Sequence, residues 1–441
     1  NTCGSNRQRG VLSVNWISLL GEAKSGIMIK KITLDNFFSF QHTEINLESD
    51  VNLMVGINGS GKSNLFKALD LLKWGMKGEL AELVRSWGGF DNIYCKCSGE
   101  TEYQDNVGIK FLLDPSVLSK YNYNFQDDIE YQIVLRKKPS FDNYDVLEWV
   151  DFVKDDRDQN FRQLHFQHGR GWIIEKKQED EVLRDEQENY SGSNNWHKVH
   201  YDDKNPEELV LADMNDTNRY PALTALAKAF KAMDLYHYLN VRPGSPLRMS
   251  MKATGEEKLQ REGDNLFSVL NTLDIKHTQV SEELRDKLNV VNEQFKDLRF
   301  LQYGSGVFQA FLKEQKLKGA IHAAHVSDGT LIFLCLLSIL LNPSRGPVVF
   351  IDEPEKGLHP DMIVELGALI AEAGKGSQII VATHSPQLLN GFKLRNIRVF
   401  EKDKKNTSVV KKFEEKNFAE WYEEFAPGNM WEKGEFGGVR F

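Results

Sequence analysis

The sequence is poor in cysteine, in long apolar runs and in excess positive charge. Its four cysteines, Cys3, Cys95, Cys97 and Cys335, are too few and too scattered for a disulfide framework, which favours a reducing compartment. We therefore expect a cytoplasmic protein. Cys95 and Cys97 also lack the spacing of a zinc knuckle, so no metal site is expected between them.

The longest apolar run, residues 331–341, is too short to cross a bilayer, and no membrane partner is expected. The net charge of −9 argues against a basic protein that binds nucleic acid over its whole surface, but it leaves room for a local positive stripe. Residues 1–27 show no pattern of a cleaved signal, and Met28 resembles a natural start. We expect these first residues to form a poorly ordered leader.

A glycine-rich stretch at residues 56–63 fits the phosphate-binding pattern G-x-x-x-x-G-K-[ST]. Residues 51–55 before it are typical of a buried strand, and residues 64–72 after it place apolar side chains at helical spacing. In this context backbone N–H groups, a helix N-terminus and a lysine can hold a polyphosphate. We predict that Ser63 binds Mg²⁺ and that ATP is bound by Gly56, Asn58, Gly59, Ser60, Gly61, Lys62, Ser63 and Asn64.

The remaining N-terminal half is rich in strand patterns. Residues 32–40 and 43–47 alternate like the strands of a hairpin, and a short helix is expected over 78–87. The strand-like runs that follow predict an antiparallel β subdomain; they are residues 107–113, 129–135 and 146–153.

Residues 175–216 are polar and dense in charge, and we interpret them as exposed. Helical patterns follow, and then strand character returns. The predicted helices are residues 222–235, 264–273 and 280–295, and the predicted strand is 300–312. No heptad pattern is long enough for an extended coiled coil.

Three pairs of histidines have the spacing His-x-x-His, which on a helix would place both rings on one face. Neither cysteines nor carboxylates complete a metal shell around them, so a structural role is favoured. The pairs are His165 with His168, His197 with His200, and His322 with His325.

A second set of motifs lies near the C-terminus. Residues 347–351 form an apolar strand that ends in Asp352 and Glu353, the Walker B pattern. Asp352 suits the Mg²⁺ shell and Glu353 suits polarisation of the attacking water. Another buried strand, residues 378–382, leads to His384, which could contact a γ-phosphate. The alternatives are acids that cap a strand and a structural histidine.

With these motifs the chain resembles the ABC-type ATPase superfamily, on its RecF-like and OLD-like branch. Residues 326–330 resemble the signature motif with Asp328 in place of a glycine, and residues 352–360 resemble a joined Walker B and D-loop. Residues 262–266 and 431–438 are also similar to segments of that branch. The resemblance implies that Ser327 and Gly329 complete the nucleotide site of a second copy, and hence an ATP-dependent homodimer.

Two positions depart from the pattern of the branch. Relatives often carry a basic residue near the adenine, where this chain has Phe38, and we expect a stacking contact in its place. The Q-loop glutamine has two candidates, Gln163 and Gln167, and the sequence favours neither.

The expected fold is therefore α/β, an ABC-type P-loop head with an antiparallel β subdomain and an inserted helical subdomain. We expect a leader at residues 1–27, an N-terminal ATPase lobe at 28–175, a helical insert at 176–318 and a C-terminal ATPase lobe at 319–441. The expected cofactors are ATP and Mg²⁺.

The expected function is an ATP-gated clamp, and three interpretations compete for what it acts on. The RecF-like resemblance implies a DNA-linked ATPase in genome maintenance or phage defence, with an effector protein such as a nuclease as a partner. A switch that contacts only a protein partner is the alternative. An OLD-like nuclease is disfavoured because the stretch after His384 lacks the acidic cluster of a TOPRIM site, and a transporter motor because the signature is degenerate. Residues 393–416 are the densest basic stretch for a DNA contact, although acids interrupt it.

Overall fold

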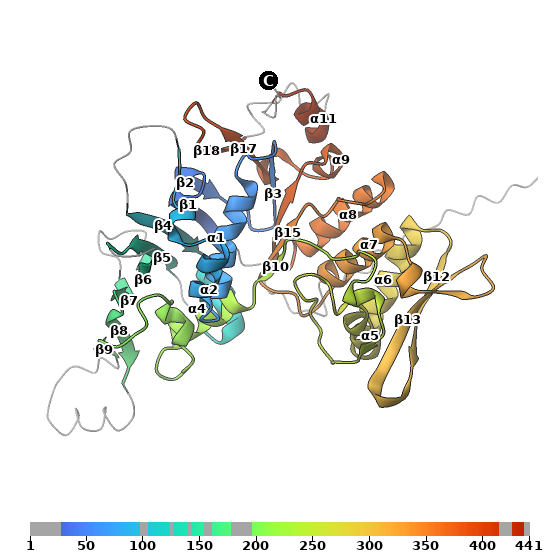
Figure 1. Ribbon diagram of the computed structural model, residues 1–441, viewed down its shortest axis with the longest axis horizontal. Coiled ribbons are helices and arrows are strands. Elements are labelled where there is room, and N and C mark those ends of the chain that lie inside the picture. The colour runs from blue at the N-terminus through green and yellow to red at the C-terminus, as the bar shows by residue number, and fades with distance from the viewer. Residues whose placement is uncertain are drawn as a thin grey trace, which may run out of the picture.

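The computed structural model describes residues 28–97, 105–123, 127–139, 143–153, 161–177, 196–413 and 426–435. Within these ranges the chain forms three β-sheets with helices packed between and around them (Figure 1). The predicted leader at residues 1–27 lies outside the described residues. No helix in the described part of the chain is both long and apolar enough to span a bilayer.

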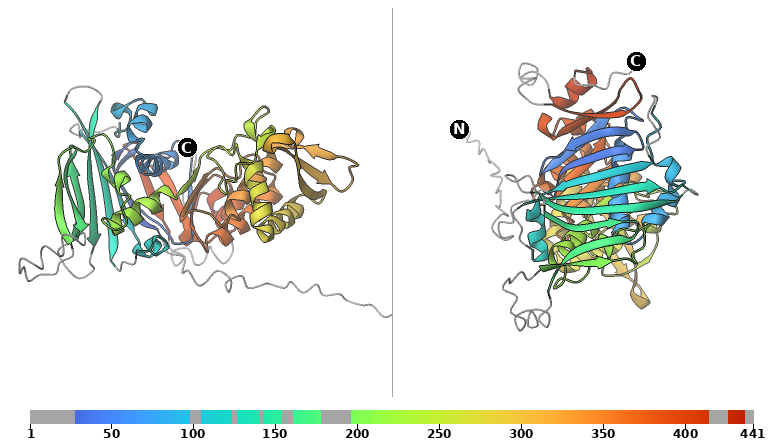
Figure 2. Two further views of the ribbon diagram at one scale, coloured as in Figure 1. Left: turned by 90° about the horizontal axis from the view of Figure 1, so that it is seen from below. Right: turned by 90° about the vertical axis from the view of Figure 1, so that its left-hand side faces the viewer.

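The molecule has two lobes, and an eight-stranded antiparallel sheet forms the outer part of the first (Figure 2). Its spatial order is β2 (Phe40–Asn46), β1 (Ile29–Phe37), β4 (Asn106–Leu113), β5 (Asp128–Lys137), β6 (Tyr144–Val153), β7 (Phe161–Gln167), β8 (Arg170–Lys176) and β9 (Trp196–Tyr201). Alternate residues are buried, as in β5, because one face packs on α4 (Pro221–Lys231). Phe230 of α4 lies 5.4 Å from Tyr131, centroid to centroid. The predicted antiparallel subdomain is confirmed.

The central sheet has six strands in the order β10 (Asp234–Tyr236), β15 (Val348–Asp352), β16 (Gln378–Thr383), β3 (Val51–Gly56), β17 (Ile397–Lys402) and β18 (Ser408–Lys412). The first five are parallel and β18 is antiparallel. Helices cover both faces, so the strands are apolar throughout. Met54 of β3 faces one core cluster, and its neighbours Leu53 and Val55 face the other.

The helices divide between the two sides of this central sheet (Figures 1 and 2). One side holds α1 (Lys62–Gly75), α2 (Leu80–Ser86) and α4. The other side holds α5 (Leu266–Lys276), α6 (Thr278–Val291), α7 (Asp328–Leu340) and α8 (Pro360–Ala373), with the short α9 (Pro386–Leu389) and α11 (Pro427–Glu432) beyond. A small third sheet of β11 (Met251–Lys252), β12 (Phe295–Gln302), β13 (Val307–Glu314) and β14 (Ala320–His322) lies at the far end of the second lobe.

Three elements differ from the predictions. The helix predicted over residues 222–235 ends at Lys231, and the next apolar residues form β10 beside β15. The strand predicted over 300–312 is a hairpin of β12 and β13. The stretch at 175–216, interpreted as exposed, contains the edge strand β9, and its residues 209–212 are buried in the core because their side chains are apolar.

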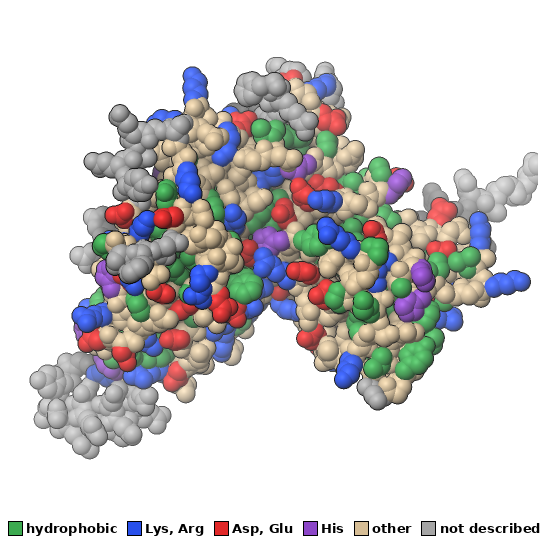
Figure 3. Space-filling view, viewed as in Figure 1, with side chains coloured by type: hydrophobic (Ala, Val, Ile, Leu, Met, Phe, Trp, Pro, Cys, Tyr) green, Lys and Arg blue, Asp and Glu red, His purple; other side chains and the backbone are tan. Residues whose placement is uncertain are grey.

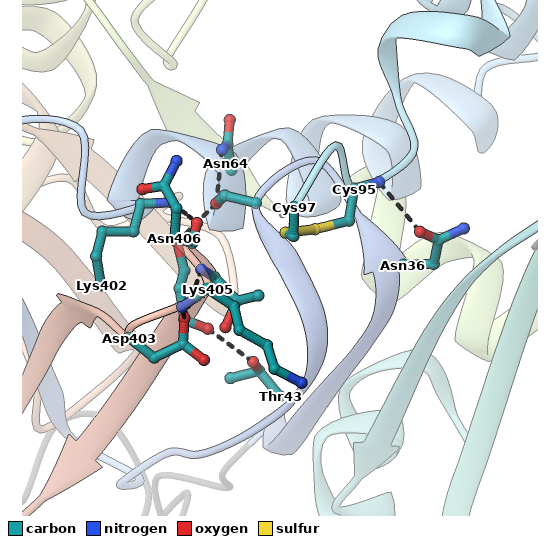
Figure 4. The surroundings of a disulfide bond; sticks show 12 residues. Asn36, Thr43, Asn64, Cys95, Cys97, Lys402, Asp403, Lys405 and Asn406 are labelled. Atoms are coloured by element: carbon teal, nitrogen blue, oxygen red, sulfur yellow. Dashed lines mark hydrogen bonds between the residues drawn. A yellow bond between two sulfur atoms is a disulfide. The ribbon is translucent and has the colours of Figure 1, made fainter. Parts of the chain in front are cut away.

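Cys95 and Cys97 form a disulfide, and Cys335 is buried and free. The disulfide lies among Asn36, Asn64 and the turn at residues 403–406 (Figure 4). The Cys95 N–H donates to the side chain of Asn36 at 3.1 Å. Because only one residue separates the two cysteines, the bond joins no distant elements and builds no framework.

Candidate nucleotide-binding site

The phosphate loop connects β3 to α1, as predicted, and close contacts require glycine at two of its positions, Gly56 and Gly61. A side chain at Gly56 would meet the Phe400 carbonyl oxygen at 2.4 Å. One at Gly61 would meet the Ser408 hydroxyl at 2.2 Å, and Gly61 has a φ of 112°. Ser408 also donates to the carbonyl of Ser60 at 2.6 Å. The adjacent β18 thus fixes the loop from outside.

Lys62 is buried within the loop. Its Nζ donates to the carbonyl of Gly56 at 2.7 Å and to that of Ile57 at 3.3 Å. Burial lowers the pKa of Lys62 to about 8, while the charges of Asp352 and Glu353 act in the opposite direction. A buried ammonium group held only by carbonyl oxygens is well matched to an incoming phosphate.

The start of α1 is open to an anion. Its N-cap, Gly61, makes no side-chain cap, and the first turn carries no acidic residue. Ser63 is exposed there, and Asn64 donates to the Ser39 hydroxyl at 2.9 Å. The hydroxyl of Ser60 is buried without a hydrogen-bond partner. These groups fit a polyphosphate with Mg²⁺ bound at Ser63.

Asp352 ends β15 at the edge where the parallel strands have their carboxyl ends, next to the phosphate loop. Its pKa is raised to about 6, chiefly by burial and also by the neighbouring Glu353, while His237 and Lys62 act in the opposite direction. A carboxylate that is costly to leave charged and buried is stabilised when a divalent cation binds. The structure therefore brings Asp352 and Lys62 into one site from opposite ends of the sequence.

Glu353 has a left-handed backbone, with a φ of 44°. Its N–H donates to the Ala382 carbonyl at 2.9 Å, which holds this conformation. Strained backbone of this kind costs about 1–3 kcal/mol and concentrates at functional positions. The Glu353 carboxylate lies 3.7 Å from His384 Nε2 and 3.4 Å from Lys356 Nζ. Glu353 and His384, both predicted from sequence, are thus neighbours.

Glu355 was not singled out by the sequence, yet it joins the two C-terminal motifs. One carboxylate oxygen accepts from the Thr383 hydroxyl at 2.7 Å and from the His384 N–H at 2.9 Å. The other oxygen is buried without a partner, and burial raises the pKa of the group. The sequence could have pointed to Glu355 because it follows Glu353 by two residues. Glu355 fixes where His384 stands.

Ser327 and Gly329 lie at the start of α7. The Ser327 hydroxyl accepts from the Thr330 N–H at 3.3 Å, so it caps the helix. A side chain at Gly329 would meet the Gly357 carbonyl oxygen at 2.9 Å. The signature segment therefore packs directly on the D-loop that follows Walker B.

Arg248, also missed by the sequence analysis, supports the signature segment. Its buried guanidinium donates to the carbonyls of Val326 (2.7 Å) and Ala324 (3.2 Å), and it is paired with the carboxylate of Asp328. It also donates to the carbonyl of Val241 at 2.7 Å. Asp328, which stands in place of the usual glycine of the signature motif, is thus paired with a buried arginine.

The two candidate glutamines lie on the outer sheet, and Phe38 lies beside the phosphate-loop helix α1. Gln163 and Gln167 are both on β7, four strands away from β1, which is about 19 Å at normal strand spacing. Lys67 Nζ lies 3.8 Å from the centroid of the Phe38 ring and covers one of its faces. Trp87 meets the Phe38 ring edge-on at 5.5 Å.

The histidine pairs take no part in a metal cluster among the described residues. Much of the basic stretch 393–416 is also occupied, as far as it is described. Arg395, Arg398 and Lys412 all pair with Glu48, and Lys411 pairs with Glu401. Figure 3 shows acidic and basic side chains interspersed over the face drawn. Four of the eight described cations in this stretch are therefore paired with acids.

Comparison with known proteins places the chain in a family. Residues 51–390 match the family described as an AAA domain, putative AbiEii toxin of a type IV toxin–antitoxin system. The chain belongs to this family. Together with the fold and the relatives described next, the match identifies an ABC-type, RecF-like ATPase.

Curated relatives match over shorter segments. A DNA double-strand break repair Rad50 ATPase of Thermoplasma acidophilum is 28% identical over 131 residues, which are 26% of this chain and 15% of that protein. A DNA replication and repair protein RecF of Leptospira interrogans is 30% identical over 108 residues, or 24% of this chain and 29% of that protein. The chain thus matches less than a third of the length of either relative.

Solved structures support the fold over most of the chain. An Smc head bound to the C-terminal winged-helix domain of ScpA has a TM-score of 0.55 at 14% identity, covering 88% of this chain and 99% of that one. An Smc head from Pyrococcus furiosus, with an extended coiled coil and bound to a domain of ScpA, has a TM-score of 0.51 at 13% identity and covers 90% and 99%. The predicted ABC-type head fold is confirmed.

Proposed function

We propose that this ATPase works as an ATP-gated homodimer coupled to DNA, in the cytoplasm. In each copy the phosphate loop and Lys62 would bind the β- and γ-phosphates, and Ser63 with Asp352 would hold Mg²⁺. Glu353 would orient the attacking water and His384 would contact the γ-phosphate. The bound Mg²⁺ would offset phosphate charge during hydrolysis.

The main support for the dimer is that the phosphate loop and the signature segment are separated within one chain. Lys62 starts α1 in one lobe and Ser327 precedes α7 in the other (Figure 1). Among the described residues no hydrogen bond or ion pair joins Ser327 or Gly329 to the loop at residues 56–64. A second copy, face to face, would supply Ser327 and Gly329 to the first copy's nucleotide.

Coupling to DNA is supported by the relatives, whose names refer to DNA repair and replication. The competing proposal is a switch that contacts a protein partner and makes no direct contact with DNA. It is supported by the two Smc heads, each of which was solved bound to a domain of ScpA. DNA that raises the rate of ATP hydrolysis would favour the first proposal.

The dimer is tested by light scattering on Glu353→Gln with ATP and Mg²⁺. This variant closes but hydrolyses slowly, so it accumulates as a dimer. Adding Ser327→Arg places bulk at the shared γ-phosphate and prevents the dimer, while ATP binding by each monomer persists. Because Ser327 also caps α7, Ser327→Ala is the matched control: it loses about 1 kcal/mol of stability without added bulk. A dimer indifferent to ATP and to Ser327→Arg would refute the clamp.

A further inference from the structure

A row of aromatic rings crosses four neighbouring strands of the eight-stranded sheet. Trp149 of β6 pairs with His165 of β7, His165 pairs with Trp172 of β8, and Trp172 pairs with His200 of β9. Residues paired directly across strands point to the same face of a sheet. We call these four residues the aromatic row.

The aromatic row lies on the outer face. The residues that alternate with it, such as Val150, Phe166 and Ile173, are buried in the core on the opposite face. The right-hand view in Figure 2 looks onto the outer face, and no described helix lies over it. The rings of the row are therefore partly or fully exposed.

Neighbouring rings of the row contact one another, one pair edge-on and one pair stacked. The centroids of Trp149 and His165 are 6.0 Å apart with the planes at 85°, and those of His165 and Trp172 are 5.8 Å apart at 23°. Lys198 Nζ lies 3.9 Å from the Trp172 centroid. The neighbouring strands thus hold two indoles and an imidazole in fixed relative positions at the surface.

Arg162 keeps the His165 ring uncharged. It makes two bonds to Asp151, at 2.7 and 2.8 Å, and its Nη1 lies 3.2 Å from His165 Nδ1. Because a guanidinium can only donate, Nδ1 must accept, which requires the neutral imidazole. Burial lowers the pKa of His165, and the charge of Arg162 lowers it further.

Positive charge flanks the row on the same face. Arg170, Lys176 and Lys198 occupy outward positions of β8 and β9, and none of them has an ion pair among the described residues. Arg170, Trp172 and His200 line a shallow groove of about 680 Å³, in which Asp202 is the acid. In a chain with a net charge of −9 this is a local excess of cations.

The other half of the same face differs. Lys31 pairs with Glu44 at 3.0 Å, and Lys110 pairs with Glu130 at 3.0 Å. Cations near β1 and β4 are therefore neutralised by the sheet itself. Among the residues that the structure describes, the β8 and β9 end combines partly exposed rings with cations that have no ion pair.

Partly exposed rings beside cations that have no acidic partner within the described ranges match one kind of ligand. Aromatic faces stack with bases of any sequence, and cations attract the phosphates between them. A duplex keeps its bases inside, so it could use the cations but not the rings. We propose that the aromatic row binds single-stranded nucleic acid. The inference names the surface and the form of nucleic acid for the DNA coupling proposed above, and it rests on that proposed function.

The binding is measured by fluorescence anisotropy with a labelled oligo(dT) of 20 nucleotides, without ATP and at low salt. Trp149→Ala and Trp172→Ala are each expected to weaken binding about 5- to 150-fold, the range for one lost base stack. Trp172→Phe, which keeps an aromatic face, should retain most of the affinity. Three phosphate contacts predict a slope of about −2 when log affinity is plotted against log salt.

Tyr303→Ala is the matched control, because Tyr303 is 52% exposed but lies in the other lobe. It should bind as the parent does. Absence of oligo(dT) binding, equal loss with Tyr303→Ala, or equal affinity for a duplex of the same length would overturn the proposal. So would a dimer that forms without nucleic acid and is broken by Trp172→Glu, because a second copy would then cover the row.

The two proposals fail separately. Stimulation of hydrolysis by duplex DNA without any oligo(dT) binding would overturn the aromatic row as a binding surface and leave the DNA-coupled ATPase in place. Oligo(dT) binding that depends on Trp149 and Trp172, with hydrolysis indifferent to every DNA, would support the surface and overturn the coupling.

Discussion

The buried guanidinium of Arg248 holds the carboxylate of Asp328 at the start of α7. The same guanidinium also ties down the Val326 carbonyl at 2.7 Å. Ser327, the residue proposed to reach the partner's nucleotide, lies between these two contacts. Arg248 is therefore a positioning residue for the signature segment.

Arg248→Ala should release this segment. Carbonyl groups left without a donor cost about 1–3 kcal/mol, so we expect an unfolding free energy lower by that amount in urea titrations. In the Glu353→Gln background the ATP-dependent dimer should weaken, while ATP binding by the monomer persists. Asp328→Asn, which keeps the carbonyl contacts of Arg248, is the matched control and should weaken the dimer less. Equal dimer formation in all variants would contradict this role.

Lys62→Ala should abolish ATP binding, because it removes the charge that meets the phosphates. Burial lowers the pKa of Lys62 to about 8. At pH 7 the charged, buried side chain therefore lowers the stability of the unliganded protein. The variant should therefore unfold at the same or a higher urea concentration than the parent. Calorimetric titration with ATP checks the first expectation. Unchanged affinity would remove Lys62 from the site.

Glu353→Gln should bind ATP normally and hydrolyse it about 10²- to 10⁴-fold more slowly, since an amide is a poor base. Lys356→Ala is the control, because Lys356 contacts the same carboxylate at 3.4 Å but is 78% exposed. Its turnover should stay close to that of the parent. Turnover of Glu353→Gln within a few-fold of the parent would transfer the role to another group, with His384 the next candidate.

A pH effect on stability is expected from Glu148, which is fully buried on the inner face of β6. Burial raises its pKa from 4.5 to about 7, although the Tyr131 hydroxyl and the N–H groups of Val210 and Leu211 donate to it. The folded state thus retains the proton in a range where the unfolded chain has lost it. The stability from this group is complete below about pH 4.5 and is lost as the pH rises through 7.

Glu148→Gln removes this titration. Relative to the parent, the variant should gain about 3 kcal/mol of unfolding free energy between pH 4.5 and pH 8. Urea unfolding of both proteins at these two pH values gives the difference. A difference between variant and parent that does not change with pH would show that Glu148 keeps an ordinary pKa in the folded protein.

The central strands could be predicted because each is a continuous apolar run that ends in a motif. This holds for β3 before the phosphate loop, β15 before Asp352 and β16 before His384. The strand β10 could not be predicted in this way, because Met233 and Leu235 continue the helical spacing of α4. Only pairing with β15, which is more than a hundred residues away in the sequence, makes a strand of them.

Supporting residues escaped prediction for a related reason. Arg248 and Ser408 belong to no motif, and Glu355 lies in the D-loop segment without an expected role. Their partners are backbone groups or loops that come together only in the fold. The aromatic row was equally hidden, since His165 and His200 were considered as metal ligands in a helical spacing. The register of four strands, rather than spacing along the chain, places them together.

The order of strands in the central sheet also bears on biosynthesis. β3 is made early, yet both of its neighbours, β16 and β17, follow at residues 378–402. Even Ile29 is held by the side chain of Gln378, 349 positions later. On the ribosome the strand that carries the phosphate loop waits with both edges unpaired, a state prone to pairing with other chains. A nascent chain that has not reached Lys402 lacks a strand beside its phosphate loop and is not expected to hydrolyse ATP.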